Sequence, residues 1–278
     1  MQDAFAYCAE LVRAADHDRF IATLFAPAER RGALHALYAF NAEIARMRDV
    51  AHSALPGEIR LQWWSEVLNG ERADEARANP VAAALLATIE RHELVASMLT
   101  ALIEARRFDL YDEPMVSMAD LEAYAKRTSS ALFALAAQIL AGVGTEAAAG
   151  PAGVANAITS VLHAFPLHAG RRQLYVPIEL LERHTVSPQD IFSGRSSGGL
   201  DAALAELRTL ARRHLLAVHQ RVTALPREAL PAFLPVALVR PSLDRLERSE
   251  PFTPGEMPPW RRQWLIWRAA RNPARIAE

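Results

Sequence analysis

Cysteine and glycine are scarce in this sequence, so several common chemistries are missing from it. Cys8 is the one cysteine among 278 residues, which excludes an internal disulfide and is typical of a protein in a reducing compartment. The 12 glycines form no Gly-rich loop of the kind that cradles phosphates. A disulfide framework and a Gly-rich nucleotide site are therefore both excluded.

Long apolar runs and a strong net charge are absent as well. No apolar run reaches the roughly 18 residues that would span a bilayer, and residues 1–20 lack the apolar core of a signal peptide. The formal net charge of −1 gives no overall field that favours nucleic acid, so we expect no nucleic-acid partner. Because 51% of the residues are hydrophobic, we expect a soluble cytoplasmic protein whose residues 1–278 form one domain.

Alternating β-branched patterns are also missing, whereas apolar residues recur at helical spacing along most of the chain. This pattern predicts an all-α fold. The expected helices cover residues 3–15, 28–49, 58–68, 80–90, 92–110, 118–142, 177–184 and 200–224. Pro56 and Gly57 predict a turn, and residues 71–80 predict a charged linker. Crowded prolines predict short, broken helices toward the end of the chain: Pro226, Pro231, Pro235, Pro241, Pro251, Pro254, Pro258 and Pro259.

The stretch that organises the chain is residues 153–177, GVANAITSVLHAFPLHAGRRQLYVP. It begins as an apolar helix, is interrupted at Pro166, and continues as a polar and basic segment. Two interpretations remain open: the wall and rim of a pocket, or a core helix followed by a solvated turn. The polar segment contains His168, Arg171, Arg172, Gln173, Tyr175 and Pro177.

This order of an apolar helix, a basic segment and Tyr-x-Pro resembles the second signature of the squalene/phytoene synthase family. In active members the helix carries two aspartates four residues apart. Anchored on Tyr175 and Pro177, these two positions fall on Ala164 and His168. The asparagine of the signature falls on Ser160, and the arginine two residues before the tyrosine falls on Gln173.

The run ALYAFNAEIARMRD resembles the first signature of the same family, in which Tyr-Ala-Phe leads into an aspartate-rich patch. Two aspartates four residues apart hold magnesium against a diphosphate in active members. Counted from Tyr38, these positions are Ala45 and Asp49, and a further acidic position falls on Arg46. The arginine expected two residues after the run falls on Ala42.

A magnesium site is therefore not expected in this chain. Magnesium takes oxygen ligands, usually carboxylates together with phosphates and waters, but only Asp49 is acidic among the four matching positions. Arg46 and His168 put positive or neutral groups where negative ones are needed. Glu43, Arg46 and Asp49 lie three residues apart and could pair along one helix face, so a solvated charge ladder and a residual pocket role both remain open. The expected cofactor is none, and Mg²⁺ applies only if the chain is active.

Other segments extend the resemblance to about residues 5–250. The phrase LPGEIRLQWWSEVL resembles the branch that contains the mitochondrial complex I assembly factor, a branch that has also lost aspartates. One of its two adjacent tryptophans is expected in the core and the other at a groove or partner surface. Asp109 matches a family aspartate, and Tyr124 with residues 128–131 matches a stretch that lines the prenyl tunnel, although tight helix packing without a tunnel is the alternative.

The resemblance implies an isoprenoid (terpenoid) synthase fold, with helices around a central cavity. The small residues Ser129, Ser130 and Ala131, with Val161 and Phe165, would line that cavity. The candidate pocket residues are Tyr38, Arg46, Asp49, Tyr124, Ser129, Ser130, Ser160, His168, Arg171, Arg172 and Tyr175.

Three functions follow from this resemblance. The first is a non-catalytic assembly or lipid-binding factor, with respiratory complex I subunits at the inner membrane as partners and a prenyl or other lipid as ligand. The alternative is an active head-to-head prenyltransferase that condenses two prenyl diphosphates. The third is a metal-free site in which Arg46, His168, Arg171 and Arg172 hold a phosphate directly.

Residues 258–278 form a tail rich in tryptophan and arginine. Trp260, Trp264 and Trp267 recur at helical spacing, and five arginines flank them. This composition suits an anionic membrane surface or an acidic partner. A helix that docks its tryptophans into the core is the alternative.

Overall fold

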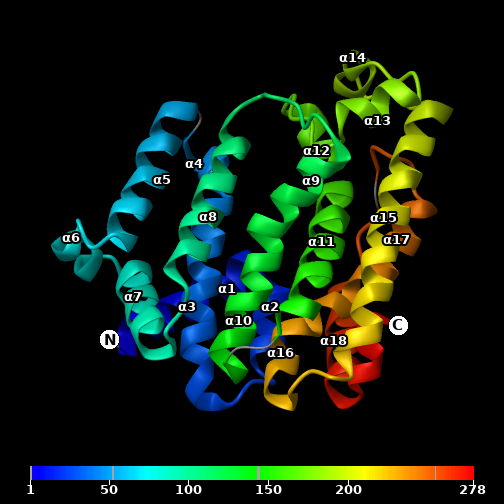
Figure 1. The fold of residues 1–278 in the computed structure, drawn as a ribbon. Coiled ribbons are helices and arrows are strands. Elements are labelled where there is room, and N and C mark those ends of the chain that lie inside the picture. Colours follow the sequence, from blue (N-terminus) through cyan, green and yellow to red (C-terminus); the bar gives the residue numbers. More distant parts are fainter. Residues whose placement is uncertain (1, 52, 143–144, 254) are drawn as a thin grey trace.

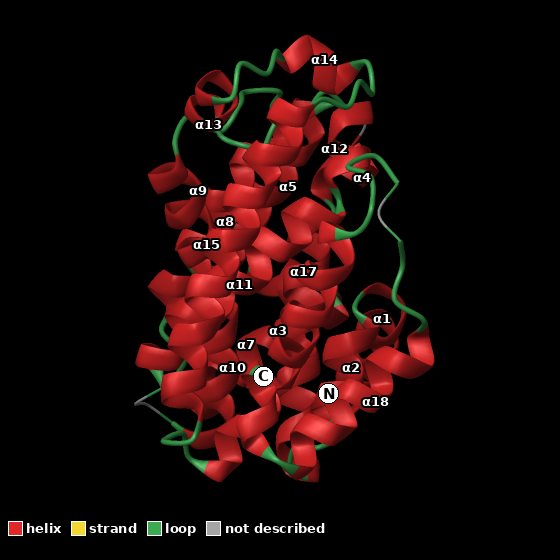
Figure 2. Ribbon diagram, turned by 90° about the vertical axis from the view of Figure 1, so that its right-hand side faces the viewer, coloured by secondary structure: helices red, strands yellow, loops and turns green. Residues whose placement is uncertain are grey.

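Helices joined by loops build the described chain, which comprises residues 2–51, 53–142, 145–253 and 255–278 of a computed structural model. No strand occurs within these ranges (Figure 2). The longer helices lie alongside one another, with α11 (Glu146–His163) between α10 (Ala131–Ala141) and α15 (Gly198–Val222) (Figure 1). The all-α fold predicted from the sequence is confirmed.

The first half of the chain runs from α1 to the 3₁₀ turn η1. α1 packs on both α3 and α7, and α5 packs on α8 and on η1. The bounds are α1 (Gln2–Ala15), α2 (His17–Thr23), α3 (Ala28–Ala45), α4 (Met47–Ala51), α5 (Ala54–Leu68), α6 (Ala73–Ala78), α7 (Pro80–His92), α8 (Ala96–Arg106) and η1 (Arg107–Leu110).

The second half surrounds α11 and ends in short helical pieces. The π segment η2 (Lys126–Ser130) joins α9 (Met118–Ala125) to α10. The remaining elements are α12 (Phe165–Gly170), α13 (Ile178–Arg183), α14 (Pro188–Phe192), η3 (Arg227–Ala229), α16 (Leu230–Phe233), η4 (Leu234–Leu238), α17 (Val239–Glu247), α18 (Pro259–Arg271) and η5 (Pro273–Ala277). The broken helices expected from the crowded prolines are therefore present, and Pro254 lies outside the described residues.

Local sequence signals explain several helix ends. Ser117 and Asp120 form a capping box at the start of α9, in which each side chain accepts the other residue's backbone N–H. Asn79 caps α7 and Pro80 follows at its first position, where the missing N–H costs no helical hydrogen bond. α11 ends at His163, just before the Phe165–Pro166 pair that starts α12, as the interruption at Pro166 predicts.

Two local predictions are wrong. Pro56 and Gly57 form no turn but lie inside the first turn of α5, where a proline is tolerated. A Cβ on Gly57 would stand 2.5 Å from a methyl carbon of Leu110, so this glycine allows α5 to pack closely on η1. Residues 71–80 are not a plain linker, because they contain α6, whose first turn carries Asp74 and Glu75.

Two long predicted helices are interrupted. The expected helix 28–49 divides at Arg46 into α3 and α4, and the expected helix 118–142 contains the π segment η2. The two adjacent tryptophans divide as predicted: Trp64 is fully buried, whereas the indole N–H of Trp63 donates to Glu75 at 2.8 Å. A π segment re-aims the side chains around it and is often found at functional sites.

Candidate functional site

Two adjoining cavities lie at the centre of the helices. We call them the Asp109 chamber, of about 300 Å³, and the Asp18 chamber, of about 240 Å³. Arg19, Asn156 and Ser160 line both of them, so α2 and α11 form the shared wall. The central cavity predicted from the family resemblance is therefore present.

The Asp109 carboxylate is the centre of a buried hydrogen-bond network. The Tyr175 hydroxyl donates to Oδ1 at 2.6 Å, and the Tyr124 hydroxyl donates to the same oxygen at 2.8 Å. Nη1 of Arg106 donates to Oδ2 at 3.0 Å and also to the Tyr124 hydroxyl at 2.8 Å. Gln173 donates to the Asp109 backbone carbonyl at 3.1 Å. Three side-chain donors, which come from α8, α9 and the segment after α12, thus stabilise one carboxylate.

Burial keeps the groups around this carboxylate in defined protonation states. Burial raises the pKa of both Tyr124 and Tyr175, and the nearby Asp109 charge adds to the effect, so both phenols stay protonated and act as donors. Burial lowers the pKa of His168 to about 4, so its imidazole is neutral at pH 7. The His168 ring lies 4.4 Å from the Tyr175 ring, centroid to centroid.

The second acidic group of the Asp109 chamber, Asp49, lies at its rim and pairs with an arginine. Nη1 of Arg171 donates to Oδ1 of Asp49 at 2.5 Å, and both side chains are 39% exposed. The neighbouring Arg48 donates to the Tyr111 carbonyl at 3.0 Å and to Asp112 at 2.5 Å. These contacts join α4 to the segments that follow η1 and α12. The Asp49 carboxylate is therefore neutralised by a guanidinium from its own chain.

The residues of this rim do not fit a magnesium ion. Among residues 2–51, 53–142, 145–253 and 255–278, no group of three or more His, Cys, Asp or Glu side chains could hold a metal. At the positions matched by the resemblance, Ala45 and Ala164 offer no ligand atom, and His168 is a buried nitrogen donor. Magnesium prefers carboxylate and phosphate oxygens, and Arg171 holds the one carboxylate that remains.

Most of the predicted pocket residues line the Asp109 chamber together. The structure brings Asp49, Tyr124, Ser129, Ser160, His168, Arg171 and Tyr175 to its wall, along with Val161 and the matched positions Ala45 and Ala164. The lining leaves out Tyr38, Arg46, Ser130, Ala131, Phe165 and Arg172.

Packing explains why the latter group lies elsewhere. Tyr38 is buried beneath the guanidinium of Arg19, which stands 5.6 Å from its ring centroid. Arg46 is exposed at the end of α3. The Ser130 hydroxyl donates to the Gly150 carbonyl of α11 at 2.7 Å, and Phe165 packs on Phe252. Arg172 stacks over Phe192 at 4.9 Å.

The family signatures do not identify several arginines of the site. Arg19, Arg48 and Arg106 all line the Asp109 chamber. Arg106 lies three residues before Asp109, a spacing that brings side chains together on a helix, so it could have been identified from the aspartate. Arg48 could not, because its partners Tyr111 and Asp112 lie more than 60 residues away.

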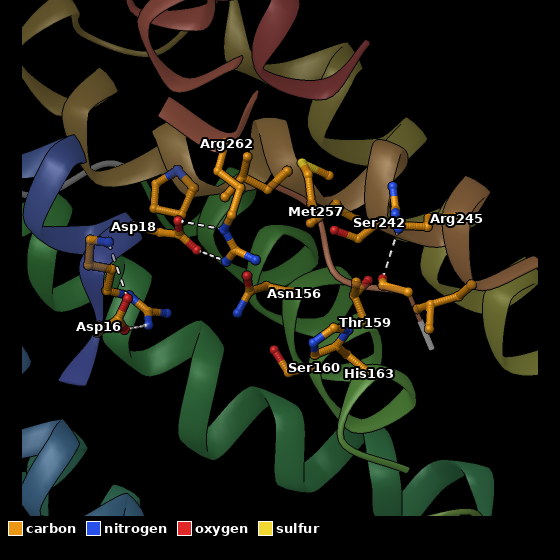
Figure 3. A pocket seen from close by; sticks show the side chains of 16 residues that line it. Asp16, Asp18, Asn156, Thr159, Ser160, His163, Ser242, Arg245, Met257 and Arg262 are labelled. Atoms are coloured by element: carbon orange, nitrogen blue, oxygen red, sulfur yellow. Dashed lines mark hydrogen bonds and ion pairs between the residues drawn. The ribbon is translucent and has the colours of Figure 1, made fainter. Parts of the chain in front are cut away.

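The Asp18 chamber is polar over most of its wall (Figure 3). The Arg262 guanidinium binds both carboxylate oxygens of Asp18, with Nε at 2.9 Å from Oδ1. Arg19 pairs with Asp16 at 2.5 Å. Other polar side chains at this chamber are Asn156, Thr159, Ser160, His163, Ser242 and Arg245. A ligand with an apolar tail would displace water from these groups without replacing their hydrogen bonds, which is unfavourable.

Comparisons with known proteins find sequence relatives of this chain. The family model of squalene/phytoene synthase matches residues 12–268. NADH dehydrogenase (ubiquinone) complex I assembly factor 6 of Rattus norvegicus is 31% identical over 248 residues, which cover 88% of this chain and 74% of the relative. The protein of that name from Homo sapiens is 30% identical over 244 residues, with 87% and 73% covered. A 15-cis-phytoene synthase of Synechocystis sp. is 24% identical over 263 residues, with 89% and 77% covered.

Solved structures share the fold at lower identity. A dehydrosqualene synthase in complex with a ligand superposes with a TM-score of 0.83 at 16% identity, over 97% of this chain and 96% of that chain. A squalene synthase from Alicyclobacillus acidocaldarius gives a TM-score of 0.67 at 19% identity, over 97% and 94%. The isoprenoid synthase fold expected from the sequence is thereby confirmed, and the chain belongs to the squalene/phytoene synthase family.

Proposed function

We propose that this chain is a non-catalytic member of its family and acts as an assembly factor for a respiratory NADH dehydrogenase of the complex I type. The observation that carries the proposal is the Asp49–Arg171 ion pair. In active members, as the sequence resemblance implies, the Asp49 position belongs to a magnesium-binding patch. Here it binds a guanidinium, and the three other matched positions are Ala45, Ala164 and His168.

Prenyl diphosphate chemistry depends on charge neutralisation. Ionisation of a diphosphate ester leaves negative charge on the departing oxygens, and a metal ion is the usual group that stabilises it. Arginine can stabilise phosphate charge without a metal, but Arg171 is already paired with Asp49 and Arg48 with Asp112. This arrangement favours binding without turnover.

The relatives support the assembly role. The assembly factors of rat and human are 31% and 30% identical, whereas the phytoene synthase of Synechocystis sp. is 24% identical. A sequence phrase that resembles the assembly-factor branch, residues 55–68, folds as α5 and packs on η1, which carries Asp109. The family cavity is retained, with Arg19, Arg48, Arg106 and Arg171 on its wall. Each of these arginines pairs with a carboxylate of the chain, so an anionic headgroup would have to displace one of those partners to bind here.

A turnover assay tests the absence of catalysis. The full chain is incubated with Mg²⁺ and either farnesyl or geranylgeranyl diphosphate, with a phytoene synthase as positive control, and products are measured by chromatography. We expect no coupled product and no released diphosphate. Magnesium-dependent product formation that Asp49→Asn abolishes would establish the alternative, an active head-to-head prenyltransferase.

A genetic experiment tests the assembly role separately. The gene is deleted in its native organism, and assembled NADH dehydrogenase is measured by native electrophoresis with in-gel activity. We expect the assembled complex to be lost and then restored by the wild-type gene. Restoration by Asp49→Asn is also expected, since the role requires no metal. A deletion strain with normal amounts of the complex would contradict the proposal.

A further inference from the structure

A basic groove lies outside the central cavity, between α17, α18 and η5. It encloses about 760 Å³. Six arginines line it: Arg240, Arg245 and Arg248 from α17 and its C-terminal cap, Arg261 and Arg268 from α18, and Arg275 from η5. None of its residues lines the Asp109 chamber, whereas Arg245, Gly255 and Met257 also line the Asp18 chamber.

Helical spacing brings these charges together. Arg240, Asp244 and Arg248 lie four residues apart and form one stripe on α17. Arg261, Trp264 and Arg268 form a comparable stripe on α18. The groove is therefore formed by two helix faces, each of which carries two arginines about two turns apart.

The acidic residues of the groove leave most of this charge uncompensated. Asp244 accepts a hydrogen bond from Arg212 of α15 at 3.1 Å, and Glu278 lies 3.3 Å from Arg268. Within the described part of the chain, no carboxylate lies within 4 Å of the guanidinium groups of Arg240, Arg248 or Arg261, and these three residues are exposed. Like charges gathered at this density favour an anionic partner.

An aromatic stripe borders the groove. The side chains of Trp260, Trp264 and Trp267 are 69%, 46% and 46% exposed, so α18 does not dock them into the core, and that alternative from the sequence is wrong. Arg268 stacks over the Trp264 ring at 5.2 Å, and Arg271 stacks over the Trp267 ring at 4.7 Å. Exposed indoles beside guanidinium groups suit the headgroup region of a bilayer. Indole rings partition into this region, and arginines contact its phosphates.

We propose that the α17–α18 groove and the tryptophan stripe together bind the surface of an anionic phospholipid bilayer. Lipid phosphates occupy the groove, and the indoles enter the headgroup region beside it. No helix in the described residues is long and apolar enough to cross a bilayer, so this contact is peripheral. The proposal stands independently of the assembly role, because the substitutions that test it, at Arg240, Arg248, Trp264 and Trp267, lie outside the lining of both central chambers.

Vesicle co-sedimentation of the full chain tests the proposal. Vesicles of phosphatidylcholine alone are compared with vesicles that also contain phosphatidylglycerol, whose negative surface attracts basic residues. We expect binding to the anionic vesicles only, and a large decrease when salt is raised from low ionic strength to about 0.5 M, because exposed charges are then screened within a few ångströms.

Paired substitutions separate the groove from the tail. Arg240→Gln with Arg248→Gln removes two groove charges that lie outside residues 258–278, and we expect about tenfold weaker binding or more. Trp264→Ala with Trp267→Ala should weaken binding by a similar factor. The matched control is Arg13→Gln with Arg127→Gln, which removes the same charge from two exposed sites that do not line the groove. It should change binding less than twofold.

Each result decides the proposal. Equal binding to neutral and anionic vesicles, no binding at low salt, or equal losses in the groove and control variants would overturn it. Capture by soluble poly-glutamate without vesicle binding would assign the groove to an acidic protein and overturn it as well. Deletion of α18 is unsuitable as a test, because Ile266 and Ala269 are buried in the core. Circular dichroism confirms that each substituted chain is folded.

Discussion

Asp109 and Asp49 line the same chamber, but they should differ strongly in their contribution to stability. Asp109→Ala leaves Arg106, Tyr124 and Tyr175 without their buried acceptor, so we expect a loss of about 3–5 kcal/mol in the free energy of unfolding. Asp49→Ala is the matched control, and its half-exposed ion pair should contribute less than about 1 kcal/mol. Urea denaturation measures both values, and equal losses would contradict this account of the site.

Histidine burial should make the protein less stable in mild acid. Burial lowers the folded pKa of His168 and of His35 to about 4, from an ordinary 6.5. Between pH 6.5 and 4 the unfolded chain binds protons at these sites and the folded chain does not, so the free energy of unfolding falls as pH falls. Above pH 6.5 both states are neutral at these residues and the effect is absent.

The measurement for this prediction is a series of urea midpoints from pH 7.5 to 4.5. His168→Gln should flatten the slope in that window, because one of the two groups no longer titrates. The matched control for the loss of an imidazole is His219→Gln, because His219 is exposed. An unaltered slope in His168→Gln would show that its imidazole is protonated in the folded state.

At the scale of elements, the approach of α11 to the π segment η2 depends on one glycine. A Cβ on Gly153 would stand 2.2 Å from the Ser130 backbone, whereas a Cβ on Gly150 in the same helix would meet nothing within 4 Å. Gly153→Ala should therefore separate the two elements and cost about 1–3 kcal/mol. Gly150→Ala should cost less, because its Cβ meets no residue of another element, although the following Pro151 restricts the helical conformation at this position. Thermal melts distinguish the two, and similar effects from both would rule out the close contact.

The same contact shows what sequence periodicity can and cannot predict. Apolar spacing located most of the helices because it reflects which face is buried, as for Val154 and Ile158 of α11. It could not locate η2, because a single wide turn barely changes the spacing around it. Pro56 and Gly57 predicted a turn because turn propensity depends only on residues adjacent in the sequence. The close fit of Gly57 against Leu110 is a tertiary contact, which this propensity does not include.

The candidate site likewise divides into residues that the sequence could predict and contacts that it could not. The family signatures identified positions on α4, α9 and α11 that do meet at one chamber, because the signatures are fixed to the shared fold. The fate of Asp49 could not be predicted, since its partner Arg171 is 122 residues away. Ser130 was expected at the cavity because it is small, but a small residue equally allows close helix packing, and here it contacts α11.

At the scale of the whole molecule, the Asp18–Arg262 pair fastens α18 to α2. The Arg262 guanidinium is partly buried and contacts both carboxylate oxygens, so Arg262→Gln should loosen both helices. Hydrogen exchange followed by mass spectrometry should show faster exchange in α2 and α18 and little change in α7. Arg261→Gln is the neighbouring control, because Arg261 is exposed and has no carboxylate within 4 Å in the described chain. Equal exchange in the two variants would contradict a fastening role for the pair.

The separation of Asp18 and Arg262 along the chain also determines how long Asp18 is without its partner during synthesis. Arg262 is synthesised 244 residues after Asp18, which corresponds to roughly 12–50 s at ribosomal rates of about 5–20 residues per second. During that interval α2 has no partner for Asp18, and one wall of the Asp18 chamber stays open. Ribosome-bound chains stalled before residue 259 should therefore be cleaved by protease around residues 16–27, while released full-length chains resist. The protein would then close this chamber only after Arg262 has been synthesised, which leaves a window in which a chaperone can act on it.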